Sequence, residues 1–350
     1  MANILSAGDH FVAPGLFVDA IRSAVPAGTP LDFSELMLPW PLEPFGPVEN
    51  VFEASGSVDD LIEALAGVDI AVTQMAPFTA RVFDACPDLR FIGVCRGGPV
   101  NVDLESATRA GVAVSYAPGR NAQAAAEFAI GLMLAAMRRI AAADAELRGG
   151  DWRGDYYTYE RAGLELCGET VGLVGFGAIS RIVARILLAF GATVVTYDPF
   201  ADPAEVAGDG VELIELDELL SRSAVVSLHA RLTHESHHLI DADRLALMRP
   251  GAVLVNTARG GLLDYAPLPG LLASGHLGAV ALDVYDVEPP PADWPLMSAP
   301  NVVLSPHLAG ATTQTAKRAA GIVASEVAHF LGGEDCRFIA NRQVLERGSA

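Results

Sequence analysis

The chain has 350 residues, of which 51% are hydrophobic, and carries a formal net charge of −20 at pH 7. This size allows two domains with buried cores, whereas the charge disfavours nucleic acid and acidic lipid surfaces as partners. No apolar run reaches the roughly 18 residues that a membrane helix needs, the start lacks a secretory signal, and the four cysteines show no paired metal spacing. We therefore expect a cytoplasmic protein with reduced thiols, no bound metal, and no membrane partner.

Short β-branched runs alternate with amphipathic stretches in the first third of the chain. Strands are predicted at residues 70–73, 89–94 and 111–115, and helices at 78–85 and 102–110. This alternation is typical of parallel strands crossed by helices. The sequence therefore predicts an α/β fold that begins with a small open-sheet domain.

An alanine-rich segment, residues 121–147, is predicted to form one helix interrupted only at Gly131. It is a candidate connecting or dimer helix. The next segment, residues 149–163, is rich in glycine and tyrosine and is predicted to be an exposed loop. Its tyrosines and arginines suit surface or dimer contacts better than substrate contacts, and a homodimer is expected.

The segment ETVGLVGFGAISRIVARILLAFGATVVTYDPF, residues 169–200, indicates a strand, a glycine turn, a helix and a second strand. Gly175 allows a tight turn, and Gly177 lets the backbone approach a pyrophosphate at the start of the helix. Ser180 stands where a third glycine is usual, and a small residue suffices there. Asp198 ends the second strand, where a carboxylate would bind ribose hydroxyls and disfavour an extra phosphate. This order of elements favours a nucleotide-binding turn over a purely structural one. The position of Asp198 favours NAD over NADP as the nucleotide.

Three later segments place polar residues just after an apolar run: PGAVLVNTARGGLLD, GAVALDVYDVEPP and NVVLSPHLAGAT. In an open parallel sheet, the carboxyl ends of the strands face the ligand. Arg259, Asp283, Glu288 and His307 are therefore expected to converge around a bound nicotinamide. Each residue taken singly would more often be structural, and only their joint order favours a functional role.

Six sequence blocks carry a resemblance to a known family: CRGGPVNVD, GRNAQAAAEFAIGLMLA, GLVGFGAIS, LVNTARGGLLD, LDVYDVEPP and SPHLAGAT. In this order, between about Cys95 and Thr312, they resemble the D-isomer-specific 2-hydroxyacid dehydrogenases. The resemblance implies two open parallel-sheet domains. A Rossmann-type NAD domain, 118–309, would be inserted into a flavodoxin-like substrate-binding domain, 1–117 with 310–350, and the substrate would bind in the cleft between them.

The resemblance also implies roles for individual residues. Arg259 would bind the substrate carboxylate and polarise the carbonyl, and His307 would exchange a proton with the substrate oxygen. Glu288 would stabilise the protonated imidazole and raise its pKa. The residues implied to contact NAD are Gly175, Gly177, Ala178, Ile179, Asp198, Thr257, Ala258, Asp283 and Gly310, the last within the segment 307–310.

A loop in the first domain is expected to bind the substrate carboxylate. It contains Arg96, Gly97, Gly98 and Pro99. Because Pro99 has no amide N–H, Gly98 and Val100 are the candidate donors, and Arg96 is a candidate source of positive charge. In the cofactor domain, two residues depart from the family pattern: Ala178 lacks a polar side chain, and Arg231 stands where the family usually has proline.

The predicted reaction is the NAD-dependent interconversion of a small D-2-hydroxy acid and its 2-keto acid. 3-Phosphoglycerate is a candidate substrate, although no phosphate-binding residue can be assigned among Arg81, Arg120, Arg153 and Arg161. The main alternative is a non-catalytic NAD(H)-sensing scaffold, which the retained catalytic residues disfavour. Formate oxidation needs no proton shuttle, and that branch pairs the histidine with glutamine rather than an acid.

The stretch HESHH, residues 234–238, fits the pattern of a helical zinc-protease site. It follows a predicted strand, 224–229, and no further ligand is evident nearby. We therefore expect a solvated turn here rather than a metal site.

Overall fold

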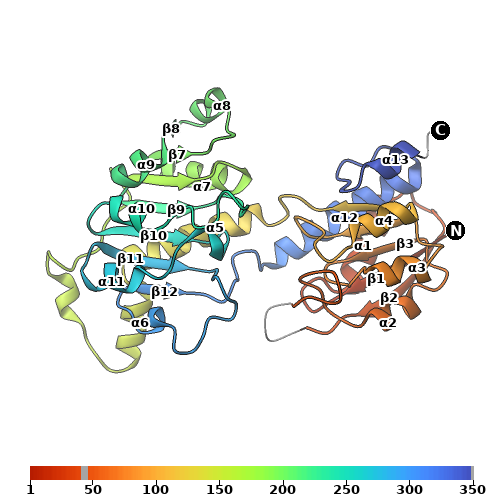
Figure 1. Cartoon of the computed structure of the whole chain (residues 1–350), viewed down its shortest axis with the longest axis horizontal. Coiled ribbons are helices and arrows are strands. Elements are labelled where there is room, and N and C mark those ends of the chain that lie inside the picture. Colours follow the sequence, from red (N-terminus) through yellow and green to blue (C-terminus); the bar gives the residue numbers. More distant parts are fainter. Residues whose placement is uncertain (41–45, 348–350) are drawn as a thin grey trace. The chain divides into compact units, whose positions relative to one another are not determined.

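The fold is described from a computed structural model, which covers residues 1–40 and 46–347. The chain divides into two compact units. Unit 1 comprises Met1–Asn121 and Ala311–Ala350, and unit 2 comprises Ala122–Gly310. The sequence analysis places these divisions at 117/118 and 309/310. Both units are α/β, as predicted, and both chain ends lie in unit 1 (Figure 1).

Unit 1 contains a five-stranded parallel sheet with the strand order β2-β1-β3-β4-β5. This is the flavodoxin-like order that the resemblance implies. Four elements before residue 70, namely β1, α1, β2 and α2, had no counterpart in the sequence analysis. The elements are β1 (Ala2–Gly8), α1 (Pro14–Ala24), β2 (Leu31–Met37), α2 (Val58–Ala64), β3 (Ile70–Thr73), α3 (Ala80–Ala85), β4 (Phe91–Val94), α4 (Leu104–Ala110), β5 (Ala113–Tyr116), α12 (Thr313–Gly332) and α13 (Gln343–Arg347).

Helices cover both faces of the unit 1 sheet (Figure 1). Helices α1 and α12 pack together on one face, and α2, α3 and α4 cover the other. A Cβ added at Gly93 in β4 would lie 2.5 Å from the side chain of Val323 in α12, so glycine permits this close approach. The side chain of Asn341 pairs with the backbone of Val112 and Val114. The two ends of the chain thus build one core.

Unit 2 contains a seven-stranded parallel sheet with the order β12-β11-β10-β9-β6-β7-β8. The direction of the order changes between β6 and β9, which makes the glycine turn after β6 the switch point of a Rossmann-type sheet. Its elements are α5 (Ala122–Met137), α6 (Ile140–Arg148), η1 (Gly154–Tyr157), β6 (Thr170–Val174), α7 (Ala178–Ala189), β7 (Thr193–Tyr197), α8 (Pro203–Gly208), β8 (Glu212–Leu213), α9 (Leu216–Arg222), β9 (Val225–Leu228), α10 (Ala242–Leu247), β10 (Ala252–Asn256), η2 (Gly260–Leu262), α11 (Leu268–Ala273), β11 (Leu277–Leu282), η3 (Pro295–Met297) and β12 (Val302–Leu304).

The alanine-rich segment forms two helices, α5 and α6, so the prediction of one helix interrupted at Gly131 is wrong. Gly131 lies inside α5. The chain breaks instead at Arg139, whose φ of +54° is incompatible with a continuous helix. The guanidinium of Arg139 binds Asn301 and lies over the ring of Tyr156, so tertiary contacts hold the break.

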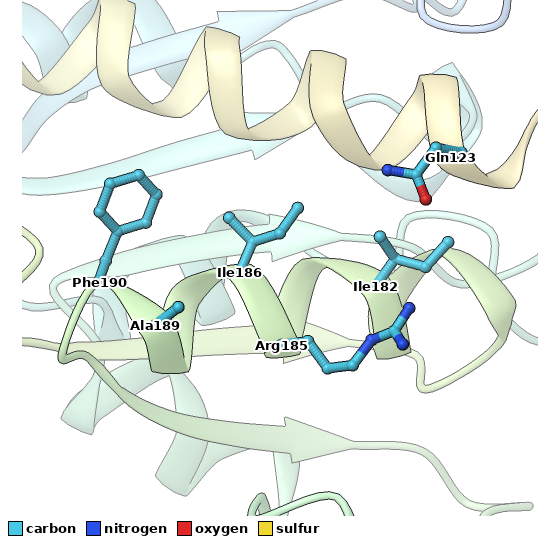
Figure 2. Close-up of a pocket in the computed structure, with 6 residues that line it drawn as sticks. All are labelled: Gln123, Ile182, Arg185, Ile186, Ala189 and Phe190. Atoms are coloured by element: carbon cyan, nitrogen blue, oxygen red, sulfur yellow. The ribbon is translucent and has the colours of Figure 1, made fainter.

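Helix α5 packs against α7, and a groove lies between them (Figure 2). Its lining is mainly apolar and comprises Gln123, Ile182, Arg185, Ile186, Ala189 and Phe190. In the described part of the chain, no helix is both long and apolar enough to cross a membrane.

Candidate active site

The glycine turn joins β6 to α7. Gly175 has a φ of +94°, and a Cβ there would lie 2.8 Å from the amide nitrogen of Ala230, so this position requires glycine. A Cβ at Gly177 would meet no atom within 4 Å, so the space at the start of α7 is open. The hydroxyl of Ser180 donates to the Gly175 carbonyl at 2.6 Å. The serine that replaces the usual third glycine therefore closes the turn.

Asp198 follows β7 and is hydrogen-bonded to the backbone of the glycine turn. Its carboxylate accepts hydrogen bonds from the amides of Phe176, at 2.8 Å, and Phe200, at 2.9 Å. The predicted NAD contacts Ala178 and Ile179 are the first two residues of α7. The turn, the helix start and Asp198 therefore form one continuous surface for a dinucleotide.

Asn256, the last residue of β10, organises the loop that carries Arg259. Its side chain accepts from the amide of Ala258, at 3.1 Å, and donates to the carbonyl of Arg259, at 3.0 Å. The Arg259 side chain is exposed. Next to it, the hydroxyl of Thr257 is buried without a hydrogen-bond partner. A polar atom left unpaired at a strand end is a suitable contact for a ligand.

Glu288 and His307 lie on different loops and are joined by a hydrogen bond of 2.8 Å between Oε2 and Nδ1. Burial by itself would raise the pKa of Glu288. The hydrogen bond and charge of His307, the amide of Tyr285 and the charge of Arg259 outweigh burial and lower this pKa below its usual value. Glu288 is therefore a carboxylate near neutral pH and would stabilise a protonated imidazole.

The loops that carry Arg259 and Glu288 are in direct contact. A Cβ at Gly260 would lie 2.0 Å from the carbonyl oxygen of Tyr285, so only glycine fits between them. The structure thus brings Arg259, Glu288 and His307 together within unit 2.

Asp283 holds the turn that presents His307. The buried carboxylate accepts from the amides of Leu308 and Ala309, each at 2.8 Å, and from the hydroxyl of Ser305, at 2.6 Å. His307 itself has a φ of +56°, a strained conformation for a residue with a side chain. Asp283 is predicted from the sequence to lie at the nicotinamide, and its positioning of the His307 turn is an additional role that the structure shows. Its contact with the nicotinamide of NAD stays a prediction, as does the NAD contact of Gly310, the last residue of unit 2.

His229, which follows β9, lies beside the glycine turn and was not among the predicted site residues. Its Nε2 lies 2.9 Å from the Ser227 hydroxyl, and the next residue, Ala230, contacts the glycine turn. Burial lowers the pKa of His229 to about 4, so the ring is neutral at physiological pH. Its position after an apolar strand was the available signal.

In unit 1, the Arg96 guanidinium is engaged by its own domain. It binds the Glu53 carboxylate, the Glu53 carbonyl at 3.0 Å and the Met75 sulfur at 2.9 Å. A Cβ at Gly97 or Gly98 would meet no atom within 4 Å, so the loop backbone is open. The loop amides are therefore better candidates for carboxylate binding than the Arg96 side chain.

The HESHH stretch lies in an irregular turn after β9. The rings of His237 and His238 stack at 4.0 Å, and Nε2 of His238 lies 4.0 Å from the Asp286 carboxylate. Across residues 1–40 and 46–347, no three His, Cys, Asp or Glu side chains are grouped so that they could hold a metal ion.

Comparison with known proteins places this site in a family. Residues 130–309 match the description "D-isomer specific 2-hydroxyacid dehydrogenase, NAD binding domain". A D-3-phosphoglycerate dehydrogenase of Mycobacterium tuberculosis is 42% identical over 277 residues, covering 79% of this chain and 52% of that protein. A glyoxylate reductase of Korarchaeum cryptofilum is 37% identical over 295 residues, covering 84% and 89%. The chain spans about half the length of the phosphoglycerate dehydrogenases that it matches.

Solved structures agree with this fold. That of a D-2-hydroxyisocaproate dehydrogenase has a TM-score of 0.80 at 26% identity and covers 97% of this chain and 99% of its own. That of a glyoxylate reductase from Paecilomyes thermophila has a TM-score of 0.74 at 28% identity, covering 98% and 99%. The open start of α7, the unpaired Thr257 hydroxyl and Asp198 all fit a bound dinucleotide. The chain therefore belongs to the D-isomer-specific 2-hydroxyacid dehydrogenase family, and unit 2 is its NAD-binding domain.

Proposed function

We propose that the protein is an NAD-dependent dehydrogenase that interconverts a small D-2-hydroxy acid and its 2-keto acid. The observation that carries this proposal is the 2.8 Å hydrogen bond between Glu288 and His307, with the charge of Arg259 acting on the same carboxylate. These are the three groups that such a reaction needs: a carboxylate binder, a proton carrier and a counter-charge for that carrier.

From the geometry we infer which atom of each group would act. Nδ1 of His307 faces Glu288, so Nε2 is the nitrogen left to exchange a proton with the substrate oxygen. During oxidation His307 takes the hydroxyl proton, and during reduction it returns a proton to the carbonyl oxygen. Glu288 remains charged in both directions and stabilises the protonated ring. The exposed Arg259 guanidinium offers two parallel donors to the substrate carboxylate.

NAD, when bound, supplies the hydride acceptor for oxidation or, as NADH, the hydride donor for reduction. The residues that would hold it are the turn Gly175–Ile179, Asp198, and the Thr257–Ala258 pair. The start of α7 would place its free amides against the pyrophosphate.

The relatives suggest two substrates. 3-Phosphoglycerate follows from the name of the mycobacterial protein, and glyoxylate from that of the archaeal one. Both acids carry the reacting carbon next to a carboxylate, which is the common feature that Arg259 would recognise.

A substrate panel tests the proposal. The purified protein should oxidise NADH with at least one short 2-keto acid. Arg259→Ala and His307→Ala should each lower turnover by about 10²-fold or more and leave NADH binding within twofold, because neither residue belongs to the glycine turn. Arg249→Ala, at an exposed arginine that precedes β10 and so lies at the opposite edge of the sheet, is the matched control. Intact NADH binding without turnover on a broad panel would favour the NAD(H)-sensing scaffold.

We also propose that the protein is a homodimer that pairs through residues 149–163. Three aromatic side chains of this segment are almost fully exposed: Trp152 at 84%, Tyr157 at 96% and Tyr159 at 95%. Exposed aromatic groups of this size are typical of interfaces, and a two-fold axis would bury both copies of the segment. Light scattering after gel filtration should show a dimer that Trp152→Ser with Tyr157→Ser shifts toward monomer. A monomeric wild type would contradict the proposal.

A further inference from the structure

A cluster of polar side chains lies at the carboxyl edge of the unit 1 sheet. Asp9 follows β1, Gln74 follows β3, and Arg120 comes shortly after β5. The register pairs Ala7 with Thr73, Thr73 with Val94 and Val94 with Tyr116, so these strands end at one level. The three side chains therefore emerge at the same edge of one sheet.

The buried thiol of Cys95, just after β4, shows that two of these groups lie close together. Burial is the main reason that the pKa of Cys95 is raised to about 12, and the charges of both Arg120 and Asp9 also act on it. Gln74 and Cys95 are the next residues after the paired Thr73 and Val94, so Gln74 is the neighbour of Cys95 on the adjacent strand.

Each of the three polar side chains has a buried atom without a hydrogen-bond partner: Oδ2 of Asp9, Oε1 of Gln74 and Nη1 of Arg120. Asp9 is 0% exposed and Gln74 is 5% exposed. Buried polar atoms are almost always paired in folded proteins, so three unpaired ones at one edge require an explanation. Oδ1 of Asp9, in contrast, accepts from the amides of Phe11 and Val12, each at 2.8 Å.

Arg120 differs from the other half-buried arginines of the described chain. Each of the others donates a hydrogen bond to an acidic or amide side chain. These other arginines are Arg96, Arg139, Arg153, Arg181, Arg222 and Arg244. The Arg120 guanidinium makes no such bond in the described part. Its backbone is nevertheless fixed, because Arg318 donates to the Arg120 carbonyl at 2.8 Å. A guanidinium on a fixed backbone that has no hydrogen-bond partner of its own is suited to an external oxygen.

We propose that Asp9, Gln74 and Arg120 form a binding site in unit 1 for a polyhydroxy acid. The site offers the Arg120 guanidinium as a donor and the oxygens of Asp9 and Gln74 as acceptors. A hydroxyl group can pair with the donor and with the acceptors, because it both accepts and donates a hydrogen bond. A phosphate offers acceptors only and would leave Asp9 and Gln74 unpaired. A chain of hydroxyl groups fits this set better than a phosphorylated tail does.

The existence of this binding site does not depend on the proposed function. The further inference that its ligand is also the substrate rests on that function. If both hold, the substrate is a sugar acid rather than 3-phosphoglycerate.

Binding to the intact chain tests the site. Isothermal titration calorimetry with NADH present, so that no hydroxy acid is oxidised, would compare D-erythronate, D-lactate and 3-phosphoglycerate. Erythronate should bind at least tenfold more tightly than lactate, the effect of one hydrogen bond to a charged group. Gln74→Leu and Arg120→Met should each weaken erythronate binding about tenfold and leave lactate binding within twofold. Arg337→Met, at an exposed arginine of unit 1, should change neither affinity.

The outcomes separate the site from the reaction. Erythronate binding that is lost in Gln74→Leu supports the site even if no acid is oxidised. Equal affinities for erythronate and lactate, unchanged by both variants, would overturn the site while leaving the proposed reaction standing. Tightest binding of 3-phosphoglycerate, dependent on Arg120 but not on Gln74, would also overturn it. Arg120→Met removes a half-buried side chain, so its binding result is used only if its melting temperature matches that of Arg337→Met. If the two melting temperatures differ, the result for Gln74→Leu alone decides the test.

Discussion

The two sheet edges of this protein differ in how their carboxylates and neighbouring polar side chains are bonded, apart from the unpaired Thr257 hydroxyl in unit 2. In unit 2, the carboxylates of Asp283 and Glu288 are bonded to nearby amides and to His307. In unit 1, Asp9, Gln74 and Arg120 each keep a buried atom unpaired. In terms of the proposed roles, the groups that would position and stabilise the proton carrier are fixed in advance, whereas the groups that would recognise a ligand retain bonding capacity for it.

The largest expected effect comes from removing the charge beside His307, the proposed proton carrier of unit 2. Glu288→Gln keeps a hydrogen-bonding side chain but removes the negative charge that would stabilise protonated His307. We expect kcat to fall about 10²- to 10⁴-fold, and more for reduction at high pH, where His307 must hold a proton. A pH profile of kcat measures this. Turnover equal to wild type would show that the charge plays no part.

The same residue affects stability at low pH. Because the folded pKa of Glu288 is lowered, its contribution is present above the unfolded value of 4.5 and is lost as pH falls through the folded pKa. Glu288→Gln should therefore approach wild-type stability in acid.

The next effect breaks the positioning of His307. Asp283→Ala removes three hydrogen bonds to a buried carboxylate and should cost about 3 kcal/mol of unfolding free energy. Asp283→Asn, the milder change, should lower kcat more than it raises KM, because it disturbs the turn rather than the carboxylate binder. Denaturant titration and steady-state kinetics measure both. Asp293→Ala, which changes an exposed acidic residue, is the control. If Asp283→Asn changed only KM, this result would contradict the positioning role.

A third prediction separates two glycines of one turn. Gly175→Ala should destabilise the fold by about 2 kcal/mol or more, because its φ is positive and its Cβ would contact Ala230. Gly177→Ala should change stability by less than about 0.5 kcal/mol, since its Cβ meets open space, yet weaken NADH binding about tenfold. Thermal unfolding and fluorescence titration distinguish the two. Unchanged NADH binding in Gly177→Ala would place the pyrophosphate elsewhere.

The smallest expected effect concerns Asp9 in unit 1 and the dependence of stability on pH. Burial raises the pKa of Asp9, although nearby amides and the charges of His10 and Arg120 oppose it. The folded state therefore binds the proton more tightly than the unfolded state, and stability falls as pH rises from 3.8 through the folded pKa. Asp9→Asn should gain a few degrees in melting temperature relative to wild type between acid and neutral pH. Asp32→Asn, at an exposed acid, should show no such trend.

Local order along the chain predicted the glycine turn with Asp198 beside it, and that Arg259, Glu288 and His307 lie near one another; their functional roles stay predictions. Asp198 directly follows a strand, and Arg259, Glu288 and His307 lie on the loops after β10, β11 and β12, so the strand topology brings all of them to one edge. The break at Arg139 could not be predicted, because its cause is a contact with Asn301, far away in sequence. The role of Asp283 and the unpaired state of Gln74 and Arg120 likewise depend on which neighbours are within hydrogen-bonding distance.

The interleaving of the two units has a consequence for synthesis. Unit 2 is continuous in the chain, so it can fold as soon as it has left the ribosome. Unit 1 cannot, because α1 covers only part of one face of its sheet, and the rest stays uncovered until α12, which packs on Gly93 through Val323, has been made. The nascent chain must therefore keep an apolar sheet face from aggregating during the whole translation of unit 2, and chaperone binding in cells should be strongest in that interval.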